Sequence, residues 1–334
     1  MSPTRPTIRD VARLAGVSHQ TVSRVINKSD DVTTETRDRV DNAIVELGYR
    51  PSAIARSMAR GETHTLACIS PNLTDYTFAS IIEGAEREAR GHGYFLLSSS
   101  AESATGFEAL VDELVGHGRV DGLLIINPYA DERHRLIPEA FPLVFVGAHA
   151  RGEPISSVCL DDEAAARAAT QHLLDSGCRR IALITGPLAE DCSVDRRTGF
   201  LQALEAAGLA FDHRLEIEGD WSATSGREAL LGLARQQRLP DAVFAQNDRM
   251  ALGVLHAARD LGLRVPEQLA VIGVDDMPLA THFDPPLTTM RQDMPDIGRQ
   301  AARLLIEIIR NPEAPMLDVK LPAELVIRQS TQTA

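Results

Sequence analysis

The chain has 334 residues, with 34 Lys+Arg against 47 Asp+Glu and a formal net charge of −13. Its composition, 44% hydrophobic and 24% charged, is typical of a globular protein, and its length favours two or three domains. An acidic total argues against a nucleic-acid partner, because phosphate binding needs Lys and Arg. The charge is uneven, however. Residues 1–60 hold 10 Lys+Arg and 7 Asp+Glu, a net of +3, and the remaining residues carry −16.

Several protein classes are excluded early. Residues 1–10 contain Arg and Asp where a signal peptide needs an apolar core, so we expect a cytoplasmic protein. Apolar runs such as 123–126 are too short to span a bilayer, and no membrane partner is expected. The cysteines are scattered without a CxxC pair, which predicts reduced, buried thiols and neither a zinc site nor a disulfide framework. They are Cys68, Cys159, Cys178 and Cys192.

The first fifty residues predict three short helices. Thr7, with an acidic residue three positions later, is typical of a helix N-cap, and Ser18 can cap a second helix. Gly16 can supply a tight turn between them, and Gly48 can end the third helix. The predicted helices are Ile8–Ala15, Ser18–Ile26 and Thr33–Leu47. Their apolar residues recur at helical spacing and predict a small shared core.

Pro51 then breaks the chain before an Ala-rich stretch, residues 52–59, which Gly61 closes. This stretch is about two helical turns long, too short to be stable alone in water. We therefore expect a linker that is helical only when something holds it.

From Thr65 onward, brief apolar runs alternate with longer amphipathic segments. Strands are expected at 66–69, 94–97, 122–126, 143–146, 181–185, 242–245 and 270–274. Helices are expected at 78–90, 107–116, 164–174, 198–207 and 250–261. Such alternation predicts parallel sheets covered on both faces by helices. There are too many strands for one modest sheet, so we expect two doubly wound α/β lobes.

Two helices joined by a short turn with Gly form a helix-turn-helix. The second helix exposes side chains that can hydrogen-bond to base edges and phosphates. They are His19, Gln20, Thr21, Ser23, Arg24 and Asn27. A helical hairpin with a solvated polar face is the plain alternative. Because the caps, the turn and the choice of side chains agree, we favour DNA binding.

This head resembles that of the lactose-repressor/galactose-repressor (LacI/GalR) family. The matching motifs are Gly16-Val17-Ser18, Thr21-Val22-Ser23-Arg24-Val25, Asn27, Thr36-Arg37, Leu47-Gly48-Tyr49 and Pro51. The likeness continues to Leu325–Thr331. It implies a ligand-responsive transcriptional regulator, a repressor, that binds a palindromic double-stranded DNA operator as a homodimer. It also implies a periplasmic-binding-protein-like body with a small-molecule effector between two lobes. No heptad extension follows residue 328, so a dimer is favoured over a tetramer.

The resemblance assigns roles to residues of the head and linker. His19, Gln20 and Arg24 match positions that read bases in the major groove. Thr7, Ser18, Thr21, Ser23 and Asn27 match positions that contact phosphate or support such contacts. Ala55, Arg56 and Met58 match the hinge helix, which lies in the minor groove. The family usually places Leu where this chain has Met58, and Met is also apolar and able to wedge between base pairs.

In the body, polar segments directly follow several predicted strands. They are Asn72, Asp191–Arg197, Glu218–Ser222, Gln246–Asp248 and Gly273–Asp276. Ligands of open α/β sheets bind beyond the carboxyl ends of the strands, so we expect these segments to share a crevice. Their mixture of hydrogen-bonding side chains and one aromatic ring suits a saccharide, and it would also suit a planar heterocycle. Each has a plain alternative: Asp248 could cap a helix, Asp275 could stabilise a turn, and the single Trp could be core.

The resemblance implies effector-binding roles for Arg196, Trp221, Asn247 and Asp275. We add Asn72 to this site because it follows the first predicted strand of the body. Some sugar-binding members of the family have an aspartate where this chain has Gly147. A sugar is our first expectation for the effector, and a purine or nucleoside is the alternative.

No enzyme motif is present: there is no GxGxxG after a strand, no P-loop, no GxSxG and no HExxH. We expect no catalytic residue, no cofactor and no metal. A sugar-binding protein or a sugar-acting enzyme is the alternative from another class, and the helix-turn-helix argues against it. The expected domains are a head at 1–50, a hinge at 51–61, and a body at 62–334 with an N-lobe (about 62–160 and 292–318) and a C-lobe (about 161–291 and 319–334).

Overall fold

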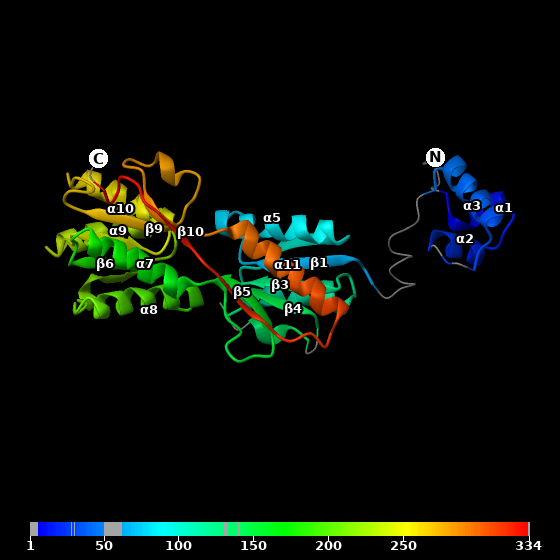
Figure 1. Cartoon of the computed structure of the whole chain (residues 1–334), viewed down its shortest axis with the longest axis horizontal. Helices are drawn as coiled ribbons and strands as arrows, with labels where there is room; N and C mark the ends of the chain where they lie inside the picture. The colour runs from blue at the N-terminus through cyan, green and yellow to red at the C-terminus, as the bar shows by residue number, and fades with distance from the viewer. Residues whose placement is uncertain are drawn as a thin grey trace. The chain divides into compact units, whose positions relative to one another are not determined.

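The computed structural model describes residues 6–27, 29, 31–49, 62–129, 133–138 and 141–332. The chain divides into two compact units, Met1–Thr63 (the head) and His64–Ala334 (the body) (Figure 1). Among the described residues, no helix has the length and apolar character needed to cross a membrane. The predicted hinge residues Ala55, Arg56 and Met58 lie outside the described residues.

The head is a small three-helix unit, as predicted. Its helices are α1 (Ile8–Ala15), α2 (His19–Ile26) and α3 (Thr34–Leu47). The Ser18 hydroxyl accepts a hydrogen bond from the Thr21 backbone N–H at 3.1 Å and so begins α2. Gly16 ends α1 and Gly48 ends α3, both in the left-handed conformation that glycine tolerates best. The buried core of the head is Val11, Ala12, Ala15, Val22, Val25, Val40 and Ala43.

The body contains two six-stranded sheets, and the predicted pair of α/β lobes is confirmed. In the N-lobe the strand order is β11-β5-β4-β3-β1-β2, and every pair is parallel. These strands are β1 (Thr65–Ser70), β2 (Phe95–Ser100), β3 (Gly122–Ile126), β4 (Leu143–Val146), β5 (Ser156–Leu160) and β11 (Asp318–Leu321). In the C-lobe the order is β12-β10-β9-β8-β6-β7, with β12 antiparallel to β10. These strands are β6 (Ile181–Thr185), β7 (Glu216–Glu218), β8 (Ala242–Ala245), β9 (Ala270–Asp275), β10 (Thr288–Arg291) and β12 (Glu324–Val326).

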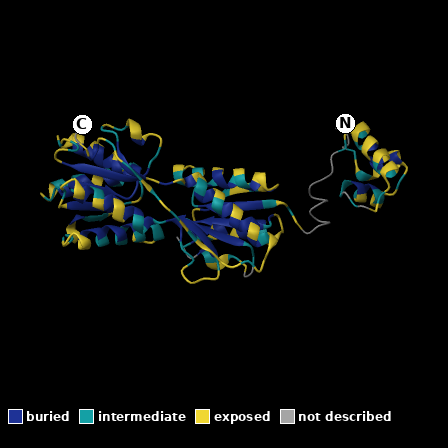
Figure 2. Ribbon diagram, in the orientation of Figure 1, coloured by how far each residue is buried: buried dark blue, intermediate teal, exposed yellow. Residues whose placement is uncertain are grey.

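Helices cover both faces of each sheet (Figure 1). The helices are α5 (Tyr76–Gly91), α6 (Ala104–Val111) extended by a π-helical turn (Asp112–Gly116), α7 (Asp162–Asp175), α8 (Asp191–Ala206), α9 (Ala223–Arg235), α10 (Asp248–Asp260) and α11 (Met294–Arg310). Short 3-10 turns span Arg133–Leu136, His213–Leu215 and Ala280–His282. In β1, Leu66 and Cys68 belong to one core cluster, and Ala67 and Ile69 to the cluster on the opposite face. Figure 2 shows the result, buried strands between helices whose outer faces are exposed.

The chain crosses between the lobes after β5, after β10 and after β11 (Figure 1). The last crossing follows Leu321, and we expected it after residue 318. Asp318–Leu321 pairs with β5 in register Asp318↔Ser157, which keeps this short strand in the N-lobe sheet. A four-residue strand carries no sequence signal for the sheet that it joins, which explains the difference.

Backbone contact between helices fixes the sides of the cleft that separates the lobes. A Cβ atom on Gly298 of α11 would lie 1.8 Å from the carbonyl oxygen of Ile81, and one on Gly84 of α5 would lie 2.0 Å from that of Pro295. Only glycine allows so close an approach of two helices. Because the first turns of α5 and α11 face the cleft, this contact positions the side chains that line it.

Candidate functional site

In the head, α2 presents polar side chains to solvent and apolar ones to the core. His19, Gln20 and Arg24 are all exposed, whereas Val22 and Val25 are buried. The residues predicted to read bases therefore share the open side of one helix. They can reach a partner without any rearrangement of the fold.

The residues predicted to position phosphate brace the helix ends. Thr7 donates its backbone N–H to Asp10 Oδ2 at 2.9 Å and its hydroxyl to the same oxygen at 2.7 Å. These hydrogen bonds lower the pKa of Asp10 below its usual value. The Ser18 and Thr21 hydroxyls lie 2.9 Å apart. In the last turn of α2, Asn27 Nδ2 donates to Ser23 Oγ at 3.4 Å.

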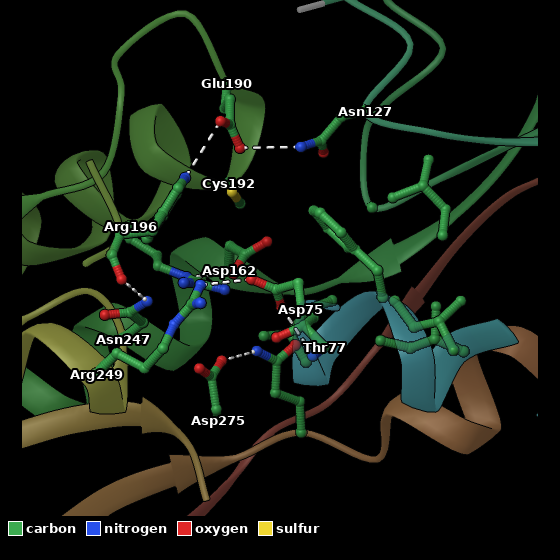
Figure 3. Close-up of a pocket in the computed structure, with 18 residues that line it drawn as sticks. Asp75, Thr77, Asn127, Asp162, Glu190, Cys192, Arg196, Asn247, Arg249 and Asp275 are labelled. Carbon is green, nitrogen blue, oxygen red and sulfur yellow. Dashed lines mark hydrogen bonds and ion pairs between the residues drawn. The ribbon is translucent and has the colours of Figure 1, made fainter. Parts of the chain in front are cut away.

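In the body, a cavity lies between the lobes, with about 90 Å³ of space open to the centre of a water molecule. Its polar lining is Asp75, Thr77, Asn127, Asp162, Glu190, Arg196, Asn247, Arg249, Asp275 and Gln292. Its apolar lining is Phe78, Ile81, Ile126, Leu160, Trp221 and Ile297, with Gly147 and Cys192 completing the wall. Figure 3 shows the Asp75 carboxylate of the N-lobe and the Arg196 and Arg249 guanidinium groups of the C-lobe facing this space.

Arg196 is the buried cation of the cavity, only 5% exposed. It lies on α8, where its Nε donates to Asp162 Oδ1 at 2.6 Å and its Nη1 to the Gln246 carbonyl oxygen at 2.5 Å. The charge is thus paired, and the planar guanidinium is held in one orientation.

Asp275 ends β9 and is buried at the floor of the cavity. Its Oδ1 accepts a hydrogen bond from Gln292 Nε2 at 2.6 Å. Burial raises the pKa of Asp275 to about 7, against the opposing effect of the Arg196 charge. The carboxyl is therefore poised between its neutral and charged forms near neutral pH.

Trp221 is fixed by contacts on several sides. Its Nε1–H donates to Glu190 Oε1 at 3.1 Å, and its carbonyl oxygen accepts from Asn247 Nδ2 at 3.1 Å. A Cβ atom on Gly186 would lie 2.0 Å from the indole ring, so the ring packs directly on that backbone. The Arg196 guanidinium carbon lies 5.9 Å from the ring centroid. The indole is rigidly presented before any ligand binds.

Two contacts join the lobes across the cavity. Asp75, which caps α5, pairs with Arg249 of α10. Asn127, which follows β3, donates to Glu190 Oε2 at 3.1 Å. Burial raises the pKa of Glu190, and the hydrogen bonds from Trp221 and Asn127 oppose this shift. The cavity is therefore bounded by polar contacts that a ligand or a lobe movement would have to exchange.

The structure brings four of the five predicted effector residues together, Arg196, Trp221, Asn247 and Asp275. Asn72 does not line the cavity. Its Oδ1 accepts from the backbone N–H groups of Thr74 and Asp75, at 3.0 and 2.8 Å, and so shapes the turn after β1. That turn delivers Asp75, instead of Asn72, to the cavity.

Two other interpretations of the body differ from the structure. Asp191–Arg197 was expected in a loop but forms the first turns of α8. Asn247, and not Asp248, caps α10, because its Oδ1 accepts from the Met250 N–H at 2.8 Å. Asp248 is fully buried and accepts from Thr289 Oγ1 at 2.6 Å and from the Met277 N–H at 2.8 Å. It joins the start of α10 to β10 and to the loop after β9.

Sequence reasoning missed several cavity residues, among them Asn127, which directly follows β3, where the strand-end rule places ligand contacts. Gly147, which directly follows β4, was named only as the position where some sugar-binding members of the family have an aspartate. Gly147 has φ +71° and no atom within 4 Å of a Cβ position. Glu190 and Arg249 lie further past the ends of β6 and β8, at the N-cap of α8 and in the first turn of α10, and we did not include them.

Models of known protein families match parts of both the head and the body. A model described as "Bacterial regulatory proteins, lacI family" matches residues 7–52, and one described as "Periplasmic binding protein-like domain" matches residues 170–331. Catabolite control protein A of Priestia megaterium is 37% identical, over 98% of this chain and 99% of its own.

Two solved structures are similar to this chain over nearly its full length. The transcriptional regulator CelR in complex with cellobiose is 35% identical, with a TM-score of 0.75 over 98% of this chain and 100% of its own. The Lac repressor dimer bound to operator and the anti-inducer ONPF is 29% identical, with a TM-score of 0.88 over 99% of this chain and 100% of its own.

Proposed function

Because the chain belongs to the LacI family of bacterial regulatory proteins, we propose that it is a transcriptional repressor controlled by a small molecule. The observation that carries this proposal is the pairing, in one chain, of an exposed polar helix in a helix-turn-helix with a cavity between two lobes that polar and apolar side chains line. Its relatives are transcriptional regulators and not enzymes. We further propose that it acts in the cytoplasm, associated with the nucleoid, because its macromolecular ligand is DNA.

The head reads the operator through α2. Arg24 suits the O6/N7 edge of guanine, and Gln20 suits adenine, because each offers two hydrogen-bonding atoms in one plane. His19 adds a third exposed polar group. Two heads of a homodimer then occupy the two half-sites of a palindrome. For the hinge, the proposal rests on sequence resemblance alone: Met58 wedges into the minor groove at the centre of the site.

Arg24→Ala tests the base-reading role. An operator is first selected from random DNA with the wild-type full chain, and its affinity is then compared with that of unrelated DNA. We expect the variant to bind the operator about 10–100-fold more weakly with little change on unrelated DNA. Arg39→Ala, which removes an exposed arginine from α3 instead of α2, is the matched control. Equal losses on both DNAs would contradict base reading by Arg24.

A sugar is the effector that the cavity supports best. Carboxylate, amide and guanidinium groups pair well with vicinal hydroxyls, which both donate and accept hydrogen bonds. Trp221 supplies a rigid apolar face of the kind that covers a pyranose ring. The solved complex of the relative CelR contains cellobiose, which makes this disaccharide the first probe.

Trp221 is the only tryptophan, so its fluorescence reports directly on the cavity. We expect a saturable change on titration with cellobiose or another saccharide of a panel, and none with nucleosides or purines. Asp275→Asn should weaken binding of the saccharide. Asp212 lies outside the cavity and is paired with Arg214, so Asp212→Asn should leave the binding unchanged. A response to purines or nucleosides alone would overturn the sugar assignment and leave the regulator assignment standing.

Exposed apolar residues support the homodimer. Edge strand β2 exposes Phe95 by 75%, and in the C-lobe Leu279 is 62% exposed beside Leu252 of α10. An apolar edge strand left in solvent invites pairing with another chain. We expect a dimer by light scattering and a shift toward monomer in Leu279→Glu. Leu136→Glu, at an exposed leucine away from these faces, is the control.

A further inference from the structure

Away from the effector cavity, three side chains of different chemistry converge in the N-lobe. His149 follows β4, Cys159 lies in β5 and Asp318 begins β11, and these strands are neighbours in the sheet. His149 Nδ1 lies 3.5 Å from Cys159 Sγ and 4.0 Å from Asp318 Oδ2. All three ligand atoms lie within 4.8 Å of one another.

These distances are close to those of a tetrahedral metal site. Bonds of about 2.0–2.3 Å from zinc to N, O and S place neighbouring ligand atoms about 3.3–3.7 Å apart. The Nδ1–Sγ pair already has this separation. The Asp318 carboxylate needs to approach by about 1 Å. Its side chain is 47% exposed, which leaves room for that movement and an entry path for the ion.

The surrounding hydrogen bonds prepare the ligands. Asp195 Oδ2 lies 2.5 Å from His149 Nε2, so the carboxylate holds the proton on Nε2 and leaves the Nδ1 lone pair directed at the cluster. A carboxylate behind a histidine ligand is the usual support of a metal-binding imidazole. On the other side, Ser157 Oγ donates to Asp318 Oδ1 and orients that carboxylate.

From this arrangement we propose that His149, Cys159 and Asp318 bind one divalent transition-metal ion of the zinc class. One nitrogen, one sulfur and one oxygen donor suit a borderline-soft ion better than Mg²⁺ or Ca²⁺, which prefer oxygen. The fourth position is open to water. None of the three residues lines the effector cavity. Because Asp195 belongs to α8 of the C-lobe, the ion also reinforces a contact between the lobes.

Metal-free full-length protein titrated with Co²⁺ tests the proposal, because a cobalt–thiolate bond gives a charge-transfer absorption in the near ultraviolet. We expect one ion per chain with this absorption, and competition by Zn²⁺. Cys159→Ser should abolish the absorption, and Cys178→Ser, at a half-buried thiol outside the cluster, should retain it. Asp195→Asn should weaken binding about 10–100-fold.

Absence of the thiolate absorption, or its persistence in Cys159→Ser, would overturn the proposal. If Cys159→Ser does not fold, Asp318→Asn replaces it, since this side chain is half exposed and its loss should also weaken Co²⁺ binding at least about 10-fold. Circular dichroism of each metal-free variant verifies the fold. Operator binding by the metal-free wild type is measured separately, so failure of the metal site leaves the regulator proposal untouched.

Discussion

In the head, His19, Gln20 and Arg24 stand exposed on one eight-residue helix, whereas in the body Arg196 and Asp275 are buried among partners from distant segments. The head keeps its polar groups in water and offers them to a large, charged surface. The body has withdrawn its polar groups from water and offers them to a molecule small enough to enter a cavity. The head thus binds a large ligand through solvent-exposed polar groups, and the body binds a small ligand through buried polar groups.

This difference extends to the ionisation of carboxyl groups. In the head, hydrogen bonds from Thr7 lower the pKa of the exposed Asp10. In the body, burial raises the pKa of Asp275 to about 7. A carboxylate that receives hydrogen bonds in water stabilises its charged form, and one removed from water destabilises it. The contributions of these two carboxyl groups to stability should therefore change with pH in opposite directions.

The largest expected effect is the pH dependence of the body. A carboxyl whose folded-state pKa is raised contributes stability that is fully present below its ordinary value of 3.8 and is lost as pH rises through about 7. Asp275→Asn removes this dependence. The free energy of unfolding is measured by Trp221 fluorescence in denaturant. Its value for the variant minus its value for the wild type should rise by up to about 4 kcal/mol between pH 4 and pH 8.

Asp10→Asn in the head should show the opposite sign. The lowered pKa of Asp10 gives stability that is present above its ordinary value of 3.8 and is lost as pH falls through the lowered pKa. Helical circular dichroism of the head transition is the measurement. The comparison would be contradicted by a stability difference between Asp275→Asn and the wild type that does not change with pH. It would also be contradicted if the stability differences of the Asp275→Asn and Asp10→Asn variants changed with pH in the same direction.

The next effect concerns helix packing in the body and should leave the head unchanged. Gly298→Ala places a methyl group against the Ile81 carbonyl oxygen and should destabilise the body by at least about 2 kcal/mol. Gly232→Ala in α9 is the matched control, because no atom lies within 4 Å of its Cβ position, and it should be neutral or stabilising by about 0.5–1 kcal/mol. Head unfolding should be unchanged in both variants. A body transition that tolerates Gly298→Ala would refute backbone contact between α5 and α11.

The smallest effect belongs to the head alone. Ser18→Ala removes the hydroxyl that accepts from the Thr21 N–H and should cost the head about 1 kcal/mol. Thermal unfolding followed by circular dichroism gives the head transition, and Trp221 fluorescence gives the body transition. A shift of the body transition by the same amount would mean that the two units do not unfold independently.

The sequence predicted the head better than the body, for a physical reason. Thr7, Gly16, Ser18 and Gly48 act on residues within a few positions of themselves, so caps and turns could be located directly. In the body, helices α9 and α11 and the short strands β5, β7 and β10–β12 were not among the predicted elements. The missed strands contain polar residues and lack the continuous apolar run that identified β3, β4, β6 and β8, so their pairing in the sheet is not visible in a local pattern.

The same contrast applies to the sites. Arg196, Trp221, Asn247 and Asp275 came from the strand-end rule and the family resemblance, and they do share the cavity. Asn72 was placed there because it follows β1, but its side chain closes a turn. The sequence did not indicate the cluster of His149, Cys159 and Asp318. We expected no metal because the cysteines are scattered without a CxxC pair, and the cluster forms only because β5 pairs with β4 and with β11.

The central claim is that occupancy of the body cavity changes the affinity of the head for DNA. The most direct measurement is the operator-binding isotherm of the full chain, with and without a saccharide that saturates the Trp221 fluorescence change. A coupling free energy of about 1–3 kcal/mol between the two sites predicts a shift of the isotherm midpoint by about 5–150-fold. Isotherms that superimpose while the fluorescence shows the cavity filled would contradict the account.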